Sequence, residues 1–382
     1  MRQHAKVLYL TPGCFDKGGI SRYNRFQIQA FREILGEDNV HAYSLLPRNE
    51  GDLEANFDVT WAPENTSGHL RNKASFVTRL AGRALVWRPD VIWTAHVNMA
   101  GFASMLAKLV NASSVLNTYG LEVWSGLSRA RVLGLKAADR VISDCEFTAG
   151  YLESSGYRRP GSVRVVWDTV DVERFYPAPA ARHVFDKYGI PDPATGINLL
   201  TLGRMTKADE YKGYGRLLEA FSMIATELPE LRLIYAGRGD LIHVLRDRVN
   251  ALGLANRVCF TGSVHEADLP DVYRCAHLFA LITDRGNGRG EGIPVTPLEA
   301  AACGVPILVG NQDGSTEAVV EGQNGHVLDS LDIKAHAAVI RTLAKSPDLR
   351  SRMGAAASHR IRAEFSYPNF REKHRAILES IH

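Results

Sequence analysis

The sequence predicts an α/β protein of two domains, each built on a parallel β-sheet that helices cover on both faces. The chain has 382 residues, which exceeds the length at which a single hydrophobic core usually stops growing, so two domains are expected. Short apolar runs alternate along the chain with segments of helical periodicity, as they do in βαβ units. These runs lack regular alternation with polar residues, which indicates strands buried on both faces.

Apolar runs in the first half predict strands separated by helices. A helix is expected to open within Phe15–Tyr23 and to continue to about Leu35. The predicted strands are Lys6–Leu10, His41–Leu45, Val91–Ala95, Ser114–Asn117, Arg140–Ser143 and Val163–Val166.

Polar residues follow three of these strands at their carboxyl ends, where ligands of such sheets bind. They are His96, the segment Thr118–Glu122 and the segment Asp144–Glu146. The position of His96 favours a role in a site over a purely structural one. Asp144 is expected to cap the helix that starts near Phe147.

A glycine pair, Gly18 and Gly19, lies between the first strand and the first helix. Such a loop can bind an anion, because unpaired N–H groups and the helix dipole face it. The GxGxxG fingerprint is absent, so a dinucleotide site is not supported. On these residues alone, an anion site and a simple connecting turn are equally compatible with the pattern.

The segment 65–89 is basic and amphipathic, with five arginines and lysines and no Asp or Glu. Such a helix can lie on an anionic membrane surface. Most amphipathic helices instead cover the core of their own domain, and the pattern favours that interpretation.

The polar, proline-containing stretch Asp171–Ala180 predicts a link between domains. After it, helices are expected over Leu331–Lys345 and Pro347–Glu364, with a last helix to near His382. Gly322–Gly325 predicts a tight hairpin turn before the last strand. The earlier predicted strands of this half are Ile197–Leu202, Leu233–Ala236, Val258–Thr261, Leu278–Ile282 and Pro306–Val309.

The most informative stretch, Asp284–Pro306, combines a glycine-rich loop, a short helix and the start of a strand. Thr296 is expected to be the N-cap of this helix, with Pro297 at its first position. Gly304 suits the left-handed conformation that ends a helix.

Two acids and two cations in the second half suit a phosphorylated, hydroxyl-rich ligand. Glu291 lies in the glycine-rich loop and Glu299 in the helix that follows, and an ionised carboxylate can accept from neighbouring hydroxyl groups. Arg204 and Lys212 lie after a predicted strand and before a predicted helix. A leaving diphosphate needs such positive charge.

The string EGIPVTPLEAAACGVP, from Glu291 to Pro306, resembles the Glu-x7-Glu signature of retaining glycosyltransferases of family 4, the glycosyl transferases group 1. The resemblance covers essentially the whole chain and is strongest from Gly203 to Gly325. It implies the GT-B fold, in which two Rossmann-like domains face each other across a cleft. It implies a first, acceptor-binding domain of residues 1–174 with a crossing helix at 366–382, and a donor-binding domain of residues 175–365.

The resemblance also implies a role for each matched residue. Glu291 would hold hydroxyl groups of the donor sugar, Glu299 would hold the ribose, and Arg204 and Lys212 would stabilise the departing diphosphate. Tyr119 stands where the family has a histidine, and a phenol is not a base near neutral pH. The further donor-binding positions are Gly18, Gly19, Val264, His265, Gly292, Ile293, Pro294 and Val295, and those on the acceptor or sugar side are Arg22, His96 and Tyr119.

The implied function is retaining transfer of a sugar from a nucleotide-sugar donor to a hydroxyl of a glycan or lipid-linked acceptor. In this family the leaving phosphate oxygen is taken to accept the acceptor's proton, so no protein base is required. The chain has no Asp-x-Asp triplet, the motif through which glycosyltransferases of the other major fold hold a metal, so neither a metal nor another cofactor is expected. A nucleotide-sugar epimerase, a phosphorylase and a non-catalytic two-lobed binding protein remain alternatives.

Composition limits the partners and the compartment. The net charge is only +3 and no Lys/Arg-rich run occurs, so nucleic acid is not an expected partner. The five cysteines form no CxxC pair, which indicates a reducing compartment. No signal peptide and no stretch of 18 apolar residues is found. A cytoplasmic location is expected, at the inner face of the membrane if the basic segment docks there.

Overall fold

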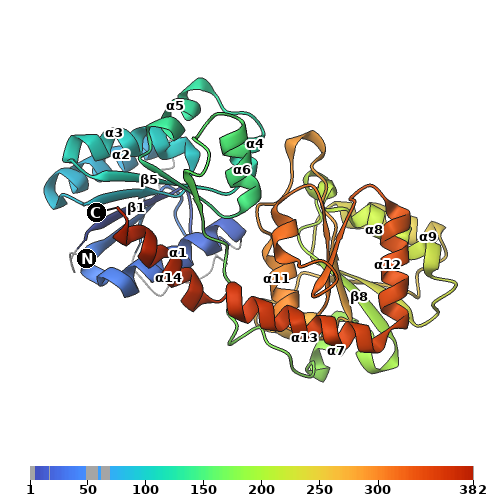
Figure 1. Cartoon of the computed structure of the whole chain (residues 1–382). Helices are drawn as coiled ribbons and strands as arrows, with labels where there is room; N and C mark the ends of the chain where they lie inside the picture. The colour runs from blue at the N-terminus through green and yellow to red at the C-terminus, as the bar shows by residue number, and fades with distance from the viewer. Residues whose placement is uncertain (1–4, 17, 49–58, 62–68, 382) are drawn as a thin grey trace. The chain divides into compact units, whose positions relative to one another are not determined.

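The protein is described by a computed structural model that covers residues 5–16, 18–48, 59–61 and 69–381 (Figure 1). The chain divides into two compact units, Met1–Thr169 with Tyr367–His382 and Val170–Ser366. This division falls near the start of the polar stretch Asp171–Ala180. Each unit contains a parallel β-sheet with helices packed against it.

In the described part of the first unit, the sheet has the strand order β3-β2-β1-β4-β5-β6-β7 and every pairing is parallel. Its strands are β1 Val7–Thr11, β2 Val40–Ser44, β3 Thr60–Trp61, β4 Val91–Thr94, β5 Ser113–Thr118, β6 Arg140–Ser143 and β7 Val163–Val165. The strands predicted in this half are confirmed to within one residue. Strand β3 was not predicted, because two residues are too few to show a periodicity.

Helices cover both faces of this sheet. Successive residues of a strand point to opposite faces, so each strand contributes side chains to both layers of the core. Tyr9 of β1 and Trp93 of β4 belong to the core cluster that includes residues of α1 and α14. Leu8 and Ile92, their neighbours in sequence, belong to the cluster under α2 and α3. The helices of this unit are α1 Gly19–Leu35, α2 His69–Trp87, α3 Val97–Val110, α4 Leu121–Trp124, α5 Arg129–Ala137, α6 Glu146–Ser154 and α14 Tyr367–Glu379.

The last helix, α14, returns to the first unit, as the resemblance to the GT-B fold predicted (Figure 1). Phe370, Ile377 and Leu378 lie in the core cluster of α1. His374 is fully buried, and its Nε2 lies 2.7 Å from Nε2 of Gln27 in α1. Residues near the end of the chain therefore complete a core that residues near its beginning also form.

In the second unit, the sheet has the strand order β10-β9-β8-β11-β12-β13, again with parallel pairings. The strands are β8 Ile197–Leu202, β9 Leu231–Ala236, β10 Val258–Gly262, β11 Leu278–Leu281, β12 Ile307–Gly310 and β13 Gly325–Leu328. The strands predicted before β13 are confirmed to within two residues. The helices are α7 Arg182–Tyr188, α8 Tyr214–Ile224, α9 Leu241–Ala251, α10 Leu269–Arg274, α11 Val295–Ala302, α12 Ile333–Lys345 and α13 Pro347–Glu364.

The hairpin predicted at Gly322–Gly325 is wrong. The chain does turn there, with Gly322 at φ +72° and its N–H donating to the carbonyl of Gly325. The strand that follows is nevertheless parallel to β12, with Ile307 paired to Gly325. Parallel neighbours require a crossover rather than a two-residue turn, and here the 3-10 helix η6 (Gly314–Ala318) lies in that crossover.

Two predicted helix caps are also wrong. Cys145, not Asp144, caps α6, because its Sγ accepts the N–H of Thr148 and the helix starts one residue earlier than expected. Helix α11 starts at Val295 with Pro294 as its N-cap, so Thr296 lies inside the first turn. The helix ends as predicted, with Gly304 at φ +83°.

Candidate active site

The structure brings Glu291 and Lys212 together at the carboxyl ends of two neighbouring strands, β8 and β11. Lys212 ends the 3-10 helix η3 (Lys207–Lys212), which follows β8, and Glu291 lies in the loop between β11 and α11. Lys212 Nζ is 3.2 Å from Glu291 Oε1, and both side chains are mostly buried. Parallel strands gather their following loops at one edge of the sheet, which explains how residues distant in sequence meet here.

A tyrosine that sequence reasoning missed also contacts Glu291. The hydroxyl of Tyr211 donates to Glu291 Oε1 at 2.7 Å. Burial and the charge of Glu291 raise the pKa of Tyr211, so the phenol stays protonated and acts as a donor. Its position beside Lys212 was the only sequence signal available.

The backbone of Glu291 is held by a buried carboxylate that was not predicted either. The N–H of Glu291 donates to Asp313 Oδ2 at 2.8 Å, and its carbonyl accepts from Gly314 at 3.1 Å. The other oxygen of Asp313 accepts from the N–H of Ser315 at 3.0 Å. Asp313 is fully buried, and burial raises its pKa to about 6, although these hydrogen bonds oppose the shift.

Arg204 follows β8, and a carboxylate fixes its guanidinium group. Its Nε and Nη2 donate to the two oxygens of Asp209 at 2.9 and 3.0 Å, while 72% of the Arg204 side chain remains exposed. Burial alone would raise the pKa of Asp209, but the bonds from Arg204 and Thr206 hold it below its usual value. The arrangement leaves a fixed, exposed cation at the same strand end as Lys212.

Glu299 lies within α11, where its carboxylate is buried. Its Oε2 accepts from the hydroxyl of Tyr273 in α10 at 2.8 Å. The eight-residue spacing in sequence thus places one acid in a loop and the other inside a helix. Between them, Ile293 and Pro294 are buried, while Gly292 and Val295 are partly exposed.

The turn after β10 holds the two remaining residues predicted in this unit. Val264 is partly exposed, and His265 caps the 3-10 helix η4 (Glu266–Asp268) through Nδ1, which accepts from Ala267 at 3.3 Å. The backbone N–H of His265 donates to the hydroxyl of Tyr188 at 3.0 Å. That N–H group already has a protein partner.

The glycine loop of the first unit is occupied by a carboxylate of its own chain. Gly18 is the N-cap of α1, the helix that begins at Gly19, and its N–H donates to Asp16 Oδ1 at 2.6 Å. The other Asp16 oxygen accepts from the hydroxyl of Ser21 at 2.7 Å. Because a negative side chain already faces this helix start, the anion-site interpretation gains no support here.

Arg22 lies one turn into α1 and contacts the end of the first unit's sheet. Its Nη2 donates to the carbonyl of Thr169 at 2.9 Å and lies 3.6 Å from Asp168 Oδ2. His96 is the N-cap of α3, with Nδ1 accepting from the N–H of Asn98 at 3.1 Å. Burial and the charge of Arg131 lower the pKa of His96, so the imidazole is neutral at neutral pH.

The structure places the phenol of Tyr119 in the core. Its hydroxyl donates to Asn24 Oδ1 at 2.7 Å and accepts from Asn117 Nδ2 at 3.0 Å. Tyr9 donates to the same Asn24 oxygen at 2.9 Å. Burial raises the pKa of Tyr119 well above its ordinary value, and the phenol belongs to a buried polar network that joins β1, α1 and β5.

Helix α2 covers its own sheet, as the favoured interpretation of the basic segment predicted. Phe76, Leu80 and Ala84 are buried in the core under it, while Val86 is 83% exposed and Leu85 45%. Residues 65–68 of the segment, and the side chains of residues 69–72, lie outside the described part of the chain.

Over the described residues, no group of three or more His, Cys, Asp and Glu side chains is placed to hold a metal ion. In the same residues, no helix combines the length and the apolar character that crossing a membrane requires.

The part of the chain that matches a known family model lies in the second unit. A model of the family described as glycosyl transferases group 1 matches residues 193–360. The GDP-mannose-dependent alpha-(1-6)-phosphatidylinositol monomannoside mannosyltransferase of Mycobacterium tuberculosis (strain CDC 1551 / Oshkosh) is 30% identical over 301 residues, which are 76% of this chain and 76% of that protein. The lipopolysaccharide core biosynthesis mannosyltransferase LpsB of Rhizobium meliloti is 27% identical over 284 residues, 71% of this chain and 73% of that protein.

Solved structures show the same architecture. Anabaena HepE in complex with UDP aligns with a TM-score of 0.80 at 18% identity, over 98% of this chain and 100% of that one. WaaG, a glycosyltransferase involved in lipopolysaccharide biosynthesis, aligns with a TM-score of 0.72 at 17% identity, over 97% and 99%. At these identities the likeness shows the fold. Together with the relatives, it shows that the chain belongs to the group 1 glycosyl transferases and is a retaining glycosyltransferase of family 4 with the GT-B fold.

Proposed function

We propose that the chain transfers mannose from GDP-mannose, with retention of configuration, to a hydroxyl group of a lipid-linked or glycan acceptor. The observation that carries this proposal is the ion pair of Lys212 with Glu291 at the carboxyl ends of β8 and β11. The choice of donor is supported by relatives whose names specify GDP-mannose. None of the relatives named above is an epimerase or a non-catalytic binding protein.

Lys212 and Arg204 would supply the positive charge that the departing GDP requires. On binding of the donor, the Lys212 ammonium group moves from Glu291 to a diphosphate oxygen. Tyr211 continues to hold Glu291 Oε1, and Oε2 accepts hydrogen bonds from hydroxyl groups of the sugar. Before the donor binds, the ion pair thus holds Lys212 and Glu291 in place. When the donor binds, each of the two side chains contacts the donor instead.

Glu299 would bind the ribose, since a buried carboxylate steadied by Tyr273 is a rigid acceptor for vicinal hydroxyl groups. Residues 292–295 would lie along the donor between the two acids. Val264 and His265 would contact the base through side chains or carbonyl groups, because the His265 N–H is already bound to Tyr188.

The first unit would contribute the acceptor side through Arg22 and His96. Tyr119 would act on this side only through the core, since its hydroxyl is bound to Asn24 and Asn117. We assign no protein base, because an oxygen of the leaving phosphate can take the proton of the attacking hydroxyl. Gly18 and Gly19 would approach the donor only if Asp16 released the N–H of Gly18.

The transfer is proposed to need no metal ion or other cofactor, since Arg204 and Lys212 provide the charge that a metal would otherwise supply. Transfer that is unchanged in excess EDTA is the expected result. Loss of activity in EDTA that added Mg²⁺ or Mn²⁺ restores would contradict this part of the proposal.

Helix α2 is proposed to rest on an anionic membrane surface, which would place the enzyme at the inner face of the membrane. Between His69 and Trp87 the helix has no Asp or Glu, and its outer side exposes Val77, Leu85 and Val86. Cosedimentation with phosphatidylglycerol vesicles should fall in Val86→Glu. Equal sedimentation of the variant and the wild type would argue against contact through this helix.

The proposed donor is tested by offering nucleotides one at a time. GDP should raise the melting temperature more than UDP, ADP or CMP, because a ligand of the folded state stabilises it by mass action. With radiolabelled GDP-mannose and a lipid extract, label should move to the lipid fraction. Turnover of UDP-sugars alone would overturn the choice of donor, and no turnover of any donor would overturn the assignment of the site.

A further inference from the structure

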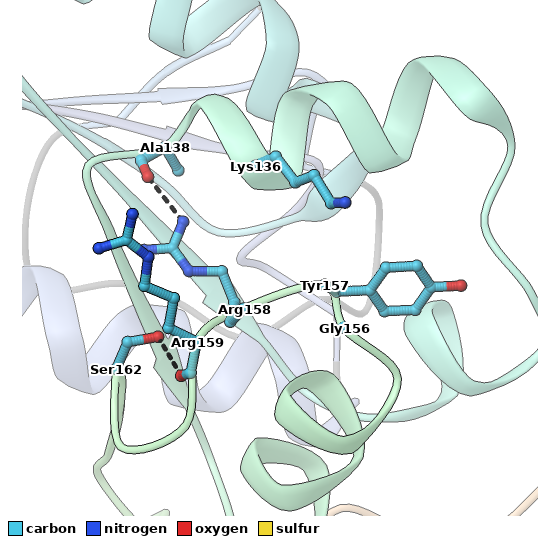
Figure 2. A pocket seen from close by; sticks show the side chains of 7 residues that line it. All are labelled: Lys136, Ala138, Gly156, Tyr157, Arg158, Arg159 and Ser162. Carbon is cyan, nitrogen blue, oxygen red and sulfur yellow. Dashed lines mark hydrogen bonds between the residues drawn. The ribbon is translucent and has the colours of Figure 1, made fainter.

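A strongly basic pocket lies in the first unit, and none of the candidate site residues lines it. Its volume is about 520 Å³, within the range of small-molecule sites. Figure 2 shows Arg158 and Arg159 extending toward Ala138, with Lys136 and Tyr157 on the other side of the view. The lining residues are Lys136, Ala138, Gly156, Tyr157, Arg158, Arg159 and Ser162, and none of these is an acid.

The topology places this pocket at the edge of the sheet opposite to the strand ends that carry His96 and Thr118. Lys136 and Ala138 lie just before β6, and Gly156–Ser162 lies just before β7. Strands β6 and β7 are parallel neighbours, so both segments meet at the amino ends of their strands. The acceptor residues proposed above follow carboxyl ends, so the pocket is separate from them.

The loop that forms the pocket is held by its own hydrogen bonds. The N–H groups of Tyr157 and Arg158 donate to the carbonyl of Leu152 at 3.0 and 3.1 Å. Both the N–H and the hydroxyl of Ser162 donate to the carbonyl of Arg159, at 3.1 and 2.6 Å. A pocket built in advance does not have to order this loop when a ligand binds.

Hydrogen bonds to backbone carbonyls hold the side chain of Arg158 in place. Its Nη1 donates to the carbonyls of Leu135 and Ala138, at 3.2 and 2.8 Å, at the end of α5. Burial lowers the pKa of Arg158, and the nearby charge of Arg159 lowers it further, against the opposing effect of Asp139. The charge of Arg159 thus disfavours the charged form of Arg158, and Figure 2 shows both side chains extending toward Ala138.

Asp139 opposes this repulsion at Arg158, but the lining of the pocket itself contains no acid. Asp139 accepts from the N–H and the hydroxyl of Ser114, both at 2.8 Å. In the described part of the chain, neither Lys136 nor Arg159 forms an ion pair. An anion in the pocket would reduce the repulsion and could pair with Lys136 and Arg159, which are both exposed.

We propose that this pocket binds a phosphate group, which pairs with Arg159 next to Arg158, while Lys136 adds positive charge from another side of the pocket. A planar guanidinium group matches two phosphate oxygens, and a lysine adds a point charge. The phosphate can belong to the headgroup of a membrane phospholipid or to a soluble phosphomonoester. Because the pocket lies at the opposite sheet edge, its ligand is distinct from the donor and the acceptor.

Binding is tested with two phosphate sources and matched variants. Soluble glycerol phosphate is titrated by calorimetry, and vesicles of phosphatidylcholine with phosphatidic acid are tested by cosedimentation against phosphatidylcholine alone. Arg159→Ala should weaken binding roughly tenfold or more, the usual range for a charged hydrogen bond. Lys136→Ala should weaken it less. Arg164→Ala, an exposed residue of β7 that does not line the pocket, is the control with the same change of charge.

The outcomes separate the sources. Binding of both probes that Arg159→Ala weakens indicates a general phosphate site, while binding of one probe alone assigns the site to lipid or to soluble phosphate. No binding of either probe, or equal weakening by Arg159→Ala and Arg164→Ala, would overturn the proposal. Glycosyl transfer measured in detergent should be the same in Arg159→Ala and wild type, which keeps this test independent of the proposed function.

Discussion

Replacing Asp313 with asparagine should slow sugar transfer while changing the free energy of unfolding little. Asp313 accepts the N–H of Glu291 with one oxygen and the N–H of Ser315 with the other. An asparagine of the same shape offers one acceptor oxygen and one NH₂ group. It can satisfy only one of the two N–H groups, so the loop that carries Glu291 loses part of its support.

The magnitude follows from the burial of Asp313. Its pKa is raised from 3.8 to about 6, so its ionised form costs the folded state about 3 kcal/mol at neutral pH. Asparagine removes that cost but leaves one buried N–H unsatisfied, at about 1–3 kcal/mol. These effects nearly cancel in stability. They do not cancel in rate, since a misplacement of about 1 Å can lower a rate roughly 100-fold.

The pH dependence has a definite sign. The pKa of Asp313 is higher in the folded than in the unfolded state, so the folded protein binds this proton more tightly. Stability from this group increases as the pH falls from about 6 to 3.8 and is lost as the pH rises through about 6. Protonation also turns an acceptor oxygen into a donor, so wild-type transfer should decline below about pH 6.

The assay combines steady-state transfer with urea unfolding, each measured from pH 5 to pH 8. Asp313→Asn should show a lower kcat, a flatter pH profile below pH 6 and a free energy of unfolding within about 2 kcal/mol of the wild type at pH 7.5. A wild-type kcat in the variant would refute the claim that Asp313 positions Glu291. A much larger loss of stability would show that its role is structural.

Three further substitutions test the roles of Lys212, of Tyr273 and of the backbone at Gly213. Lys212→Ala should lower kcat at least about 100-fold. It should lower urea stability by about 1–3 kcal/mol, because the mostly buried Glu291 loses its cationic partner. A rate within a factor of three of wild type would remove Lys212 from the mechanism. Tyr273→Phe should raise KM for the donor about tenfold by removing the hydrogen bond to Glu299 Oε2, whereas an unchanged KM would show that Tyr273 does not position Glu299 for the donor. Gly213→Ala should destabilise the protein by more than about 1 kcal/mol in thermal unfolding, since Gly213 has φ +80°; equal melting temperatures would contradict the strain argument.

Much of the fold could be predicted because parallel strands buried on both faces show as apolar runs. The sequence indicated that Lys212 and Glu291 both follow strands of the second half, but not that these strands are neighbours, so the contact between the two side chains was not predicted. The wrong prediction of a hairpin at Gly322–Gly325 came from a local turn signal. A local turn signal carries no information on which strand the following residues will join.

The supports of the site could not be predicted, because their partners are distant in sequence. Asp313 is 22 residues from Glu291, and Tyr211 is 80 residues from it. A polar residue in a loop gives no local sign of such a contact. Tyr119 was expected in an open site because it follows a strand. In the structure its hydroxyl instead forms hydrogen bonds with Asn24 and Asn117, which are buried.

The return of α14 has a consequence for biosynthesis. The ribosome releases residues 367–379 after the whole of Val170–Ser366. Until then the early half lacks Phe370, Ile377 and Leu378, and the surface of α1 that they cover stays open. The first unit therefore cannot complete its core before the second unit has been synthesised, which delays it relative to the usual order of N-terminal domains folding first.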